Sequence, residues 1–98
     1  MDISYTLQDI RFEWDETKAD SNIEKHKVSF ETSCEVFFDP FLQSKEVELI
    51  DNELREVIVG ATENLRLLYV AYTLRDDKIR IISARNVTKK ERNEYENQ

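Results

Sequence analysis

The spacing of hydrophobic residues predicts one strand and two helices in the first forty residues. The segment IRFEW predicts a short strand around residues 11–15. Asp15 is a favourable N-cap for a helix that ends near His26. Trp14, just before the cap, can pack against Ala19 one turn later. A second helix, FETSCEVFF, follows a serine cap and ends before a proline, because the residue before proline avoids the helical region.

The rest of the chain alternates with the period of a β-strand and predicts two hairpins. KEVELI and LREVIVGA flank the first turn, and LRLLYVAYTLR and KIRIISAR flank the second, at Asp76-Asp77. T-K-K-E at residues 88–91 is a capping box that opens a last helix. We therefore predict an α+β domain: an antiparallel β-sheet of about four to five strands, with two N-terminal helices and one C-terminal helix.

The length of 98 residues predicts a single domain over residues 1–98, with residues 1–9 as an N-terminal extension. One cysteine excludes an internal disulfide and any metal site built on paired cysteines. No apolar stretch approaches the ~20 residues of a membrane-spanning helix. The segment MDISYTLQDI lacks the basic and apolar regions of a signal peptide. These features predict a cytoplasmic protein without membrane contact.

Charge is distributed unevenly along the chain. Residues 1–64 contain 6 Lys or Arg and 16 Asp or Glu, whereas residues 65–92 contain 8 basic and 3 acidic residues. The net charge of −7 argues against nucleic-acid binding, but the basic last third favours an anionic partner. Two ordinary solvated faces of opposite sign would give the same pattern.

The second hairpin predicts a face suited to anions. A two-residue turn pairs Arg75 with Lys78, Thr73 with Arg80 and Ala71 with Ile82. Because side chains alternate along a strand, the predicted core face carries Val70, Tyr72, Leu74, Ile79, Ile81 and Ser83. The opposite face carries Tyr69, Ala71, Thr73, Arg75, Lys78, Arg80, Ile82 and Ala84.

Arg85 does not fit this alternation, because it lies five positions after Arg80. Either the strand ends or bulges at residues 83–85 and redirects the side chain, or Arg85 pairs with a carboxylate behind the sheet. For Arg75 and Arg80 the simpler interpretation is an exposed strand face with surface ion pairs.

His26 lies on a helical projection between a polar group (Lys18, Asn22 and Lys25) and an apolar stripe that includes Ile23. Such a border position suits a proton-transfer group. The same position also suits a packing or C-capping histidine, and lysines here would complement the C-terminal end of the helix dipole.

Several segments together resemble the BrnT family of bacterial toxins over about residues 10–96. They are F-E-W-D at 12–15, Lys18, Asn22, K-H at 25–26, V-S-F-E at 28–31, V-F at 36–37, D-P at 39–40, Arg55, Gly60, T-x-R at 73–75, R-I-I-S-A-R at 80–85, Glu91 and Tyr95. The resemblance implies a RelE-like ribonuclease fold and a type II toxin–antitoxin role. It implies RNA as substrate and a BrnA-like antitoxin that also binds promoter DNA. The implied functional residues are Trp14, Lys25, His26, Arg75, Arg80 and Arg85.

The implied chemistry is cleavage of RNA without a metal or other cofactor, by attack of a 2′-hydroxyl on the neighbouring phosphate. His26, Arg80 and Arg85 are the catalytic candidates, with His26 as acid or base and the arginines on the transition-state charge. Trp14, Lys25 and Arg75 are the substrate-binding candidates. Trp14 could stack on a base, or could serve only as the core-edge contact to Ala19.

The chain departs from the family pattern at three points. Lys27 stands where the family usually has glycine, which costs roughly 1 kcal/mol if this residue needs a positive φ. Leu54-Arg55 replaces the usual Glu-Arg, and the total charge is acidic.

These departures favour an alternative function: a catalytically weak or inactive protein-binding module that persists as an antitoxin partner or co-repressor. A housekeeping interaction domain without an antitoxin is a third possibility. In each case we expect a heterocomplex, and a homodimer is possible through the free strands at the sheet edges.

Overall fold

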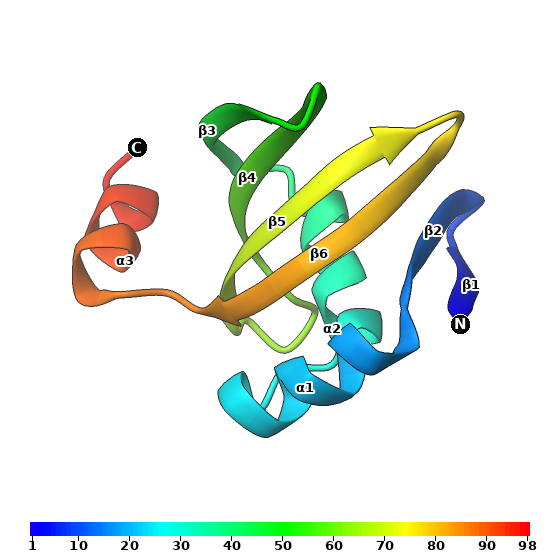
Figure 1. Ribbon diagram of the computed structural model, residues 1–98. Helices are drawn as coiled ribbons and strands as arrows, with labels where there is room; N and C mark the ends of the chain where they lie inside the picture. The colour runs from blue at the N-terminus through cyan, green and yellow to red at the C-terminus, as the bar shows by residue number, and fades with distance from the viewer.

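The computed structural model describes all residues, 1–98, and contains six strands, three α-helices and one 3-10 helix (Figure 1). The elements in chain order are β1 (Asp2–Leu7), β2 (Ile10–Asp15), α1 (Glu16–His26), α2 (Phe30–Cys34), the 3-10 helix η1 (Glu35–Phe38), β3 (Gln43–Ile50), β4 (Glu53–Ala61), β5 (Leu67–Arg75), β6 (Lys78–Asn86) and α3 (Lys89–Glu96). None of the helices has the length and apolar character needed to cross a bilayer.

The six strands form one mixed sheet in the order β1-β2-β6-β5-β4-β3. Four neighbouring pairs are antiparallel, but β2 and β6 are parallel, with Phe12 opposite Ile79 and Glu13 opposite Arg80. The α+β class is confirmed. The predicted purely antiparallel sheet of four to five strands is wrong, because the sheet has six strands and β2 pairs with β6 in parallel.

The sixth strand comes from residues predicted to be an extension. Residues 2–7 pair with β2 over six positions, and the amide of Glu16 donates to the carbonyl of Met1 at 2.9 Å. Ile3, Tyr5 and Leu7 pack against the core while the residues between them are exposed. This period-two alternation was present in DISYTL, but the polar residues around it obscured the strand signal.

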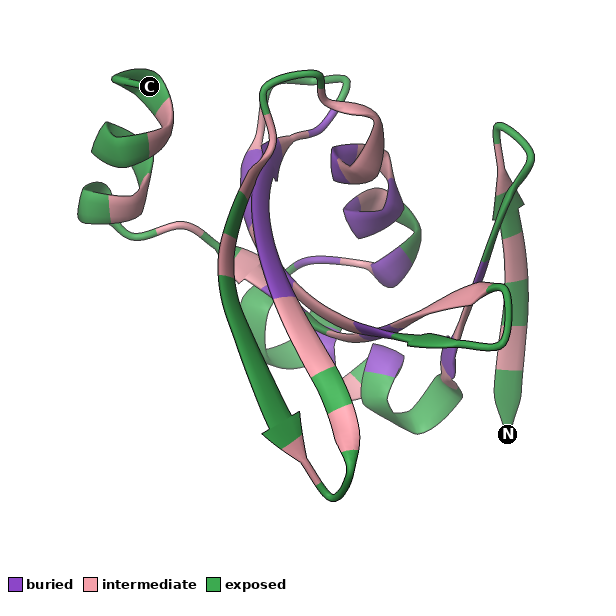
Figure 2. Cartoon of the chain, turned by 90° about the horizontal axis from the view of Figure 1, so that it is seen from above, coloured by how far each residue is buried: buried purple, intermediate pink, exposed green.

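The core lies between the sheet and the first two helices. Helices α1 and α2 cover one face of the sheet, and the largest fully buried side chains there include Trp14, Phe12, Phe30 and Leu68. Figure 2 shows buried segments on the strands and on α1 and α2, whereas α3, at one end of the sheet, has no buried residue. Cys34 also lies in this core, where burial raises the pKa of its thiol.

The predicted second helix divides into two parts. Ser29 caps α2 as expected, but the α-helical pattern ends at Cys34 and continues as η1 to Phe38. The backbone of η1 approaches β4 at Gly60, where an added Cβ would lie 3.0 Å from the carbonyl oxygen of Val36. The absence of a side chain at Gly60 therefore permits the close packing of η1 on the sheet.

Candidate functional site

A β-bulge in the second hairpin decides where the arginines point. The register pairs Arg75 with Lys78 and Thr73 with Arg80, as predicted, but then shifts, so that Ala71 pairs with Ser83 and Tyr69 with Arg85. Ile82 is the extra residue. Because Tyr69, Ala71 and Thr73 share one face of β5, their partners Arg80 and Arg85 share that face as well. The predicted pairing of Ala71 with Ile82 is therefore wrong.

The bulge also changes the core face. Ile81 and Ala84 are each 1% exposed, whereas Ser83, predicted to face the core, is exposed. Leu74 was predicted to face the core and lies on that face, yet it is 61% exposed because the helices do not reach it. We call the face that carries Arg55, Arg75, Arg80 and Arg85 the arginine face.

Arg80 is held by two carboxylates on the arginine face. Its Nη1 donates to Glu13 at 3.1 Å and its Nη2 donates to Asp2 at 3.0 Å. The hydrogen bond to Asp2 raises the pKa of Arg80 and lowers the pKa of Asp2. The Arg80 side chain is only 16% exposed. One of its two partners thus comes from β1, the strand that the sequence did not predict.

Arg85 is held by one carboxylate and one aromatic ring. Its Nη1 and Nη2 donate to the two oxygens of Glu91 at 2.9 and 3.0 Å, and its guanidinium carbon lies 3.7 Å from the centre of the Tyr69 ring. The hydrogen bonds from Arg85 lower the pKa of Glu91 to about 2. Glu91 is also the acidic residue of the predicted capping box with Thr88, which is confirmed. Of the two sequence alternatives for Arg85, the bulge applies, at Ile82 and thus one residue before the predicted segment 83–85. The alternative of a carboxylate behind the sheet is wrong, because Arg85 pairs with Glu91 on the same face as Arg80.

Arg75 and Arg55 complete the face and differ in their partners. Arg75, near the end of β5, donates to Glu53 at 2.9 Å. Arg55 lies opposite Thr73 in the register and has no ion pair, and its buried Nε has no hydrogen-bond partner. An unpartnered guanidinium in a face of paired ones is the group most ready to bind an added anion. The sequence pattern names Arg55 among the residues of the family resemblance but not among the functional candidates, and the register of β4 with β5 places it on this face.

The last turn of α1 holds Lys25 and His26, both exposed. Lys27 follows with φ 59°, in the left-handed region, so the expected cost of a non-glycine residue here, about 1 kcal/mol, applies. Arg66 connects this turn to β6: its Nη2 donates to the carbonyl of Lys27 at 2.9 Å and its Nε donates to Asn86 at 3.0 Å. Arg85 donates to the carbonyl of Asn86. A polar network through Arg66 and Asn86 therefore connects Arg85 with the backbone of Lys27, the residue after His26.

The helical projection placed Asn22 in a polar group with Lys18 and Lys25, but in the structure Asn22 is buried. It is 6% exposed, its amide nitrogen donates to the carbonyls of Ala84 and Val28, and its amide oxygen accepts from the Ala84 amide. These bonds fasten α1 beneath the C-terminal end of β6. Ile23, predicted for the apolar stripe, is 46% exposed. The helix is thus turned so that an asparagine faces the sheet.

Trp14 lies in the core and not on the surface. It is 2% exposed and its ring packs against Tyr5 and Phe30 at centroid distances of 5.5 and 5.8 Å. A hollow of about 200 Å³ beside it is lined by the carboxylates of Glu16, Asp20 and Glu31 among other residues. Three carboxylates repel RNA phosphates, so this position supports a packing role for Trp14 more than stacking on a base.

A second hollow, of about 270 Å³, lies beside Tyr69 on the arginine face. It is lined by Lys45, Glu46, Tyr69, Thr88, Lys90, Glu91 and Glu94. Burial raises the pKa of Tyr69, so its hydroxyl remains protonated near neutrality. No group of three or more His, Cys, Asp or Glu side chains is arranged to hold a metal ion.

These features define a small α+β domain whose sheet has one arginine-lined face. Over residues 14–91 the chain matches the family described as "Ribonuclease toxin, BrnT, of type II toxin-antitoxin system". The chain therefore belongs to the BrnT family of ribonuclease toxins, as the sequence pattern indicated. Membership of a type II system implies an antitoxin partner.

One solved structure gives a comparison of folds. The 1.1 Å crystal structure of the Brucella abortus ribonuclease toxin BrnT matches with a TM-score of 0.52 and 22% sequence identity, over 78% of this chain and 94% of that chain. At this identity the likeness concerns the fold alone. The fold of this chain is therefore BrnT-like, and the RelE-like description that the resemblance implied is wrong. No curated protein sequence matches the chain.

Proposed function

We propose that this chain is an endoribonuclease that cleaves RNA without a metal ion and is neutralised by a BrnA-like antitoxin. The observation that supports the proposal most is the bulge at Ile82, which sets Arg80 and Arg85 on one face of the sheet. A regular strand would have directed Arg85 to the opposite face. The bulge therefore has a consequence for ligand binding that packing alone does not require.

In the proposed reaction a general base removes the proton of an RNA 2′-hydroxyl, and the 2′-oxygen attacks the adjacent phosphorus. The bond from phosphorus to the 5′-oxygen breaks, and a general acid gives that oxygen a proton. The products are a 2′,3′-cyclic phosphate and a 5′-hydroxyl. The transition state has extra negative charge on the phosphate oxygens, which arginine side chains stabilise through paired N–H donors.

Arg80 and Arg85 serve different phosphates in this proposal. Their partners Thr73 and Tyr69 are four residues apart on β5, which places the two backbone positions ~13 Å apart. Arg85 is joined to the end of α1 and is assigned to the scissile phosphate. Arg80, with Arg55 and Arg75, is assigned to the phosphates that precede or follow it along the strand.

His26 is the proposed acid or base, and Lys25 the group that attracts the RNA backbone. Both are exposed in the last turn of α1, and the network through Arg66 and Asn86 keeps this turn near Arg85. Exposure on a turn of fixed geometry allows a substrate to reach the imidazole.

A second function has a specific observation in its favour. Each of these arginines already forms an ion pair: Arg80 with Glu13 and Asp2, Arg85 with Glu91, and Arg75 with Glu53. A phosphate must displace these carboxylates before it reaches the guanidinium groups. If a phosphate cannot displace these carboxylates, the chain is a weak or inactive module that only binds the antitoxin, as a partner or co-repressor. In both proposals promoter DNA is contacted through the antitoxin complex, and a homodimer is compatible with the free edge of β1.

The test is cleavage of a defined single-stranded RNA by the purified chain in EDTA, with the product ends mapped. We expect cyclic-phosphate ends from the wild type and a loss of about 100-fold or more in the rate for Arg85→Ala. His26→Ala should lose rate without loss of binding. Arg92→Ala is the matched control, because Arg92 forms an exposed ion pair with Glu96 within α3.

Two outcomes would contradict the proposal. Equal rates for Arg85→Ala and Arg92→Ala would remove Arg85 from the reaction. A folded wild type without cleavage would favour the binding module.

A further inference from the structure

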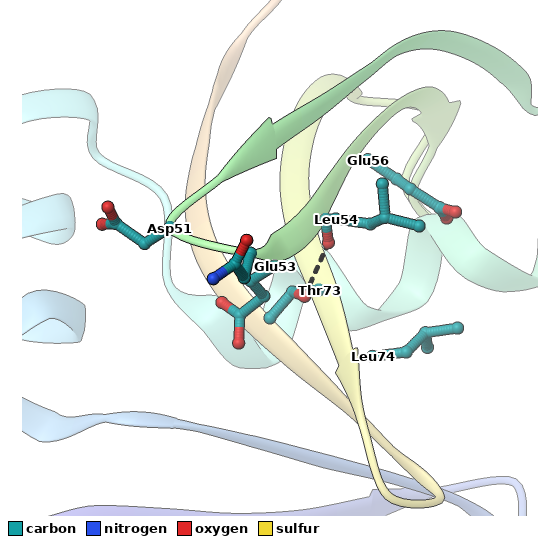
Figure 3. Close-up of a pocket in the computed structure, with 7 residues that line it drawn as sticks. Asp51, Glu53, Leu54, Glu56, Thr73 and Leu74 are labelled. Atoms are coloured by element: carbon teal, nitrogen blue, oxygen red, sulfur yellow. Dashed lines mark hydrogen bonds between the residues drawn. The ribbon is translucent and has the colours of Figure 1, made fainter.

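Three leucines form an exposed apolar row on the face opposite the arginines. Leu49 of β3 pairs with Leu54 of β4, and Leu74 of β5 lies next to Leu54, one position beyond the Arg55–Thr73 pair. Their exposed fractions are 67%, 56% and 61%. Figure 3 shows Leu54 and Leu74 projecting to the same side of the β4–β5 pair, around a pocket of about 480 Å³. We call these three residues the leucine row.

The leucine row continues the core face beyond the helices. Leu74 pairs with Ile79, which packs against the core, and Val47, next to the row on β3, is 59% exposed. The sheet therefore extends past the segment that α1, α2 and η1 cover. Four large apolar side chains, each more than half exposed in one patch, are unusual on a small domain and mark an interaction site.

The surroundings of the row are acidic. Of the acidic residues in 46–56, Glu56 lies on the face of the row and Asp51 lies in the turn beside it, whereas Glu46, Glu48 and Glu53 lie on the arginine face. Glu56 projects to the same side as Leu54 (Figure 3), and its carboxylate accepts a hydrogen bond from Tyr72 at 2.6 Å but has no ion pair. Asp51 and Asp76, in the adjacent turns, also have no ion pair. These free carboxylates favour a partner with basic residues beside its apolar ones.

The spacing of the row fits a helix. Neighbouring strands are ~4.8 Å apart and successive helical turns are ~5.4 Å apart, so one apolar residue per turn can lie on each leucine. An added strand at the β3 edge would reach Val47 and Leu49 only. That edge also has a bulge between Ser44 and Glu46 and carries further carboxylates, which oppose strand pairing. A second copy of the chain would bring like charges together.

We infer that the leucine row is the docking site for an amphipathic helix of the antitoxin, with Lys or Arg beside its apolar stripe. The inference rests on the toxin–antitoxin part of the proposed function. The docked helix lies on the face opposite Arg80 and Arg85. It anchors the antitoxin and leaves the arginine face accessible, so that another antitoxin segment must block the RNA.

The experiment co-expresses the chain with the protein encoded by the gene next to its own and measures their affinity by calorimetry. Leu54→Lys and Leu74→Lys should each weaken binding by at least about 30-fold, as expected for a central apolar contact. Glu56→Gln should weaken it several-fold and reduce its salt dependence. Leu65→Lys is the matched control, because Leu65 is 80% exposed in the turn at the other end of the sheet.

A measurement on the wild type guards against misfolded variants. On addition of the partner, the NMR methyl signals of Leu49, Leu54 and Leu74 should shift, and that of Leu65 should not. Wild-type affinity in both lysine variants, or no complex at all, would overturn the inference. So would new protection of the β3 edge amides without leucine shifts, which would indicate strand addition.

The two proposals fail separately. Arg85→Ala should abolish cleavage, and in this variant Leu54→Lys should weaken antitoxin binding by the same factor as in the wild type. A wild type that binds the partner through the leucine row but cleaves no RNA would contradict the nuclease proposal and leave the docking site in place.

Discussion

The two arginines of β6 are neutralised in different ways, although both lie on one face of one strand. Arg80 is 16% exposed and bound by Asp2 and Glu13, which come from the first two strands. Arg85 is 33% exposed and bound by Glu91, six residues later in the chain. The first pair connects distant parts of the fold, and the second fixes the start of α3. Arg80 thus contributes more to the architecture, and Arg85 is more accessible to a ligand.

The largest expected effect is the loss of unfolding free energy in Arg80→Ala, which should exceed that in Arg85→Ala. The substitution leaves Glu13, whose side chain is 15% exposed, with only Lys78 as a more distant partner at 3.8 Å. Uncompensated buried charges cost several kcal/mol, and at this partial burial we expect about 2 kcal/mol of unfolding free energy. Arg85→Ala should cost about 1 kcal/mol. Urea denaturation at neutral pH measures both, with Arg92→Ala as the exposed control. A larger cost for Arg85→Ala would reverse the comparison.

Glu91→Gln tests the other end of the strand through its pH dependence. Its ion pair with Arg85 lowers the pKa of Glu91 from 4.5 to about 2 in the folded chain. The ion pair therefore stabilises the fold fully at pH values above 4.5. That stabilisation is lost as the pH falls towards 2. Unfolding free energies should therefore converge for wild type and variant over this interval, from a difference of about 1–2 kcal/mol near neutrality. A constant difference across the same pH range would show that Glu91 acts through packing alone.

Asp2→Asn should have the smallest effect and should concern binding. Asp2 is an exposed partner of Arg80, so its removal frees one side of the guanidinium at little cost in stability. We expect affinity for a 2′-O-methyl RNA, which cannot be cleaved, to rise ~2–5-fold, the equivalent of a surface ion pair. Asp9→Asn is the matched control, since it removes the same charge from the turn of the same hairpin. Equal gains in both variants would indicate net charge rather than competition for Arg80.

The sequence predicted local features of the fold better than its long-range pairing. The caps at Asp15, Ser29 and Thr88 and the two-residue turn before Lys78 are confirmed, because each depends on a few neighbouring residues. The parallel pairing of β2 with β6 and the strand at residues 2–7 depend on contacts across the whole chain. No local pattern encodes those contacts.

The candidate site was predicted in part for the same reason. Arg75 and Arg80 lie on one face, as alternation alone predicts, and Arg85 joins them only through the bulge at Ile82. Nothing in RIISAR indicates which residue is extra. The burial of Asn22 depends on how α1 is rotated against the sheet, and helical periodicity does not determine this rotation. The burial of Trp14 depends on the place of β2 in the sheet, beside β6. The roles of His26 and Lys25 in the reaction stay predictions.

The parallel contact between β2 and β6 has a consequence for how the molecule is made. Glu13 and Arg80 are separated by most of the chain, and β2 has no partner on its inner side until β6 has been synthesised. Contacts of such long sequence separation form slowly, since loop closure precedes any gain from pairing. We expect the N-terminal hairpin to remain undocked on the ribosome and to close the sheet only after translation has passed residue 80.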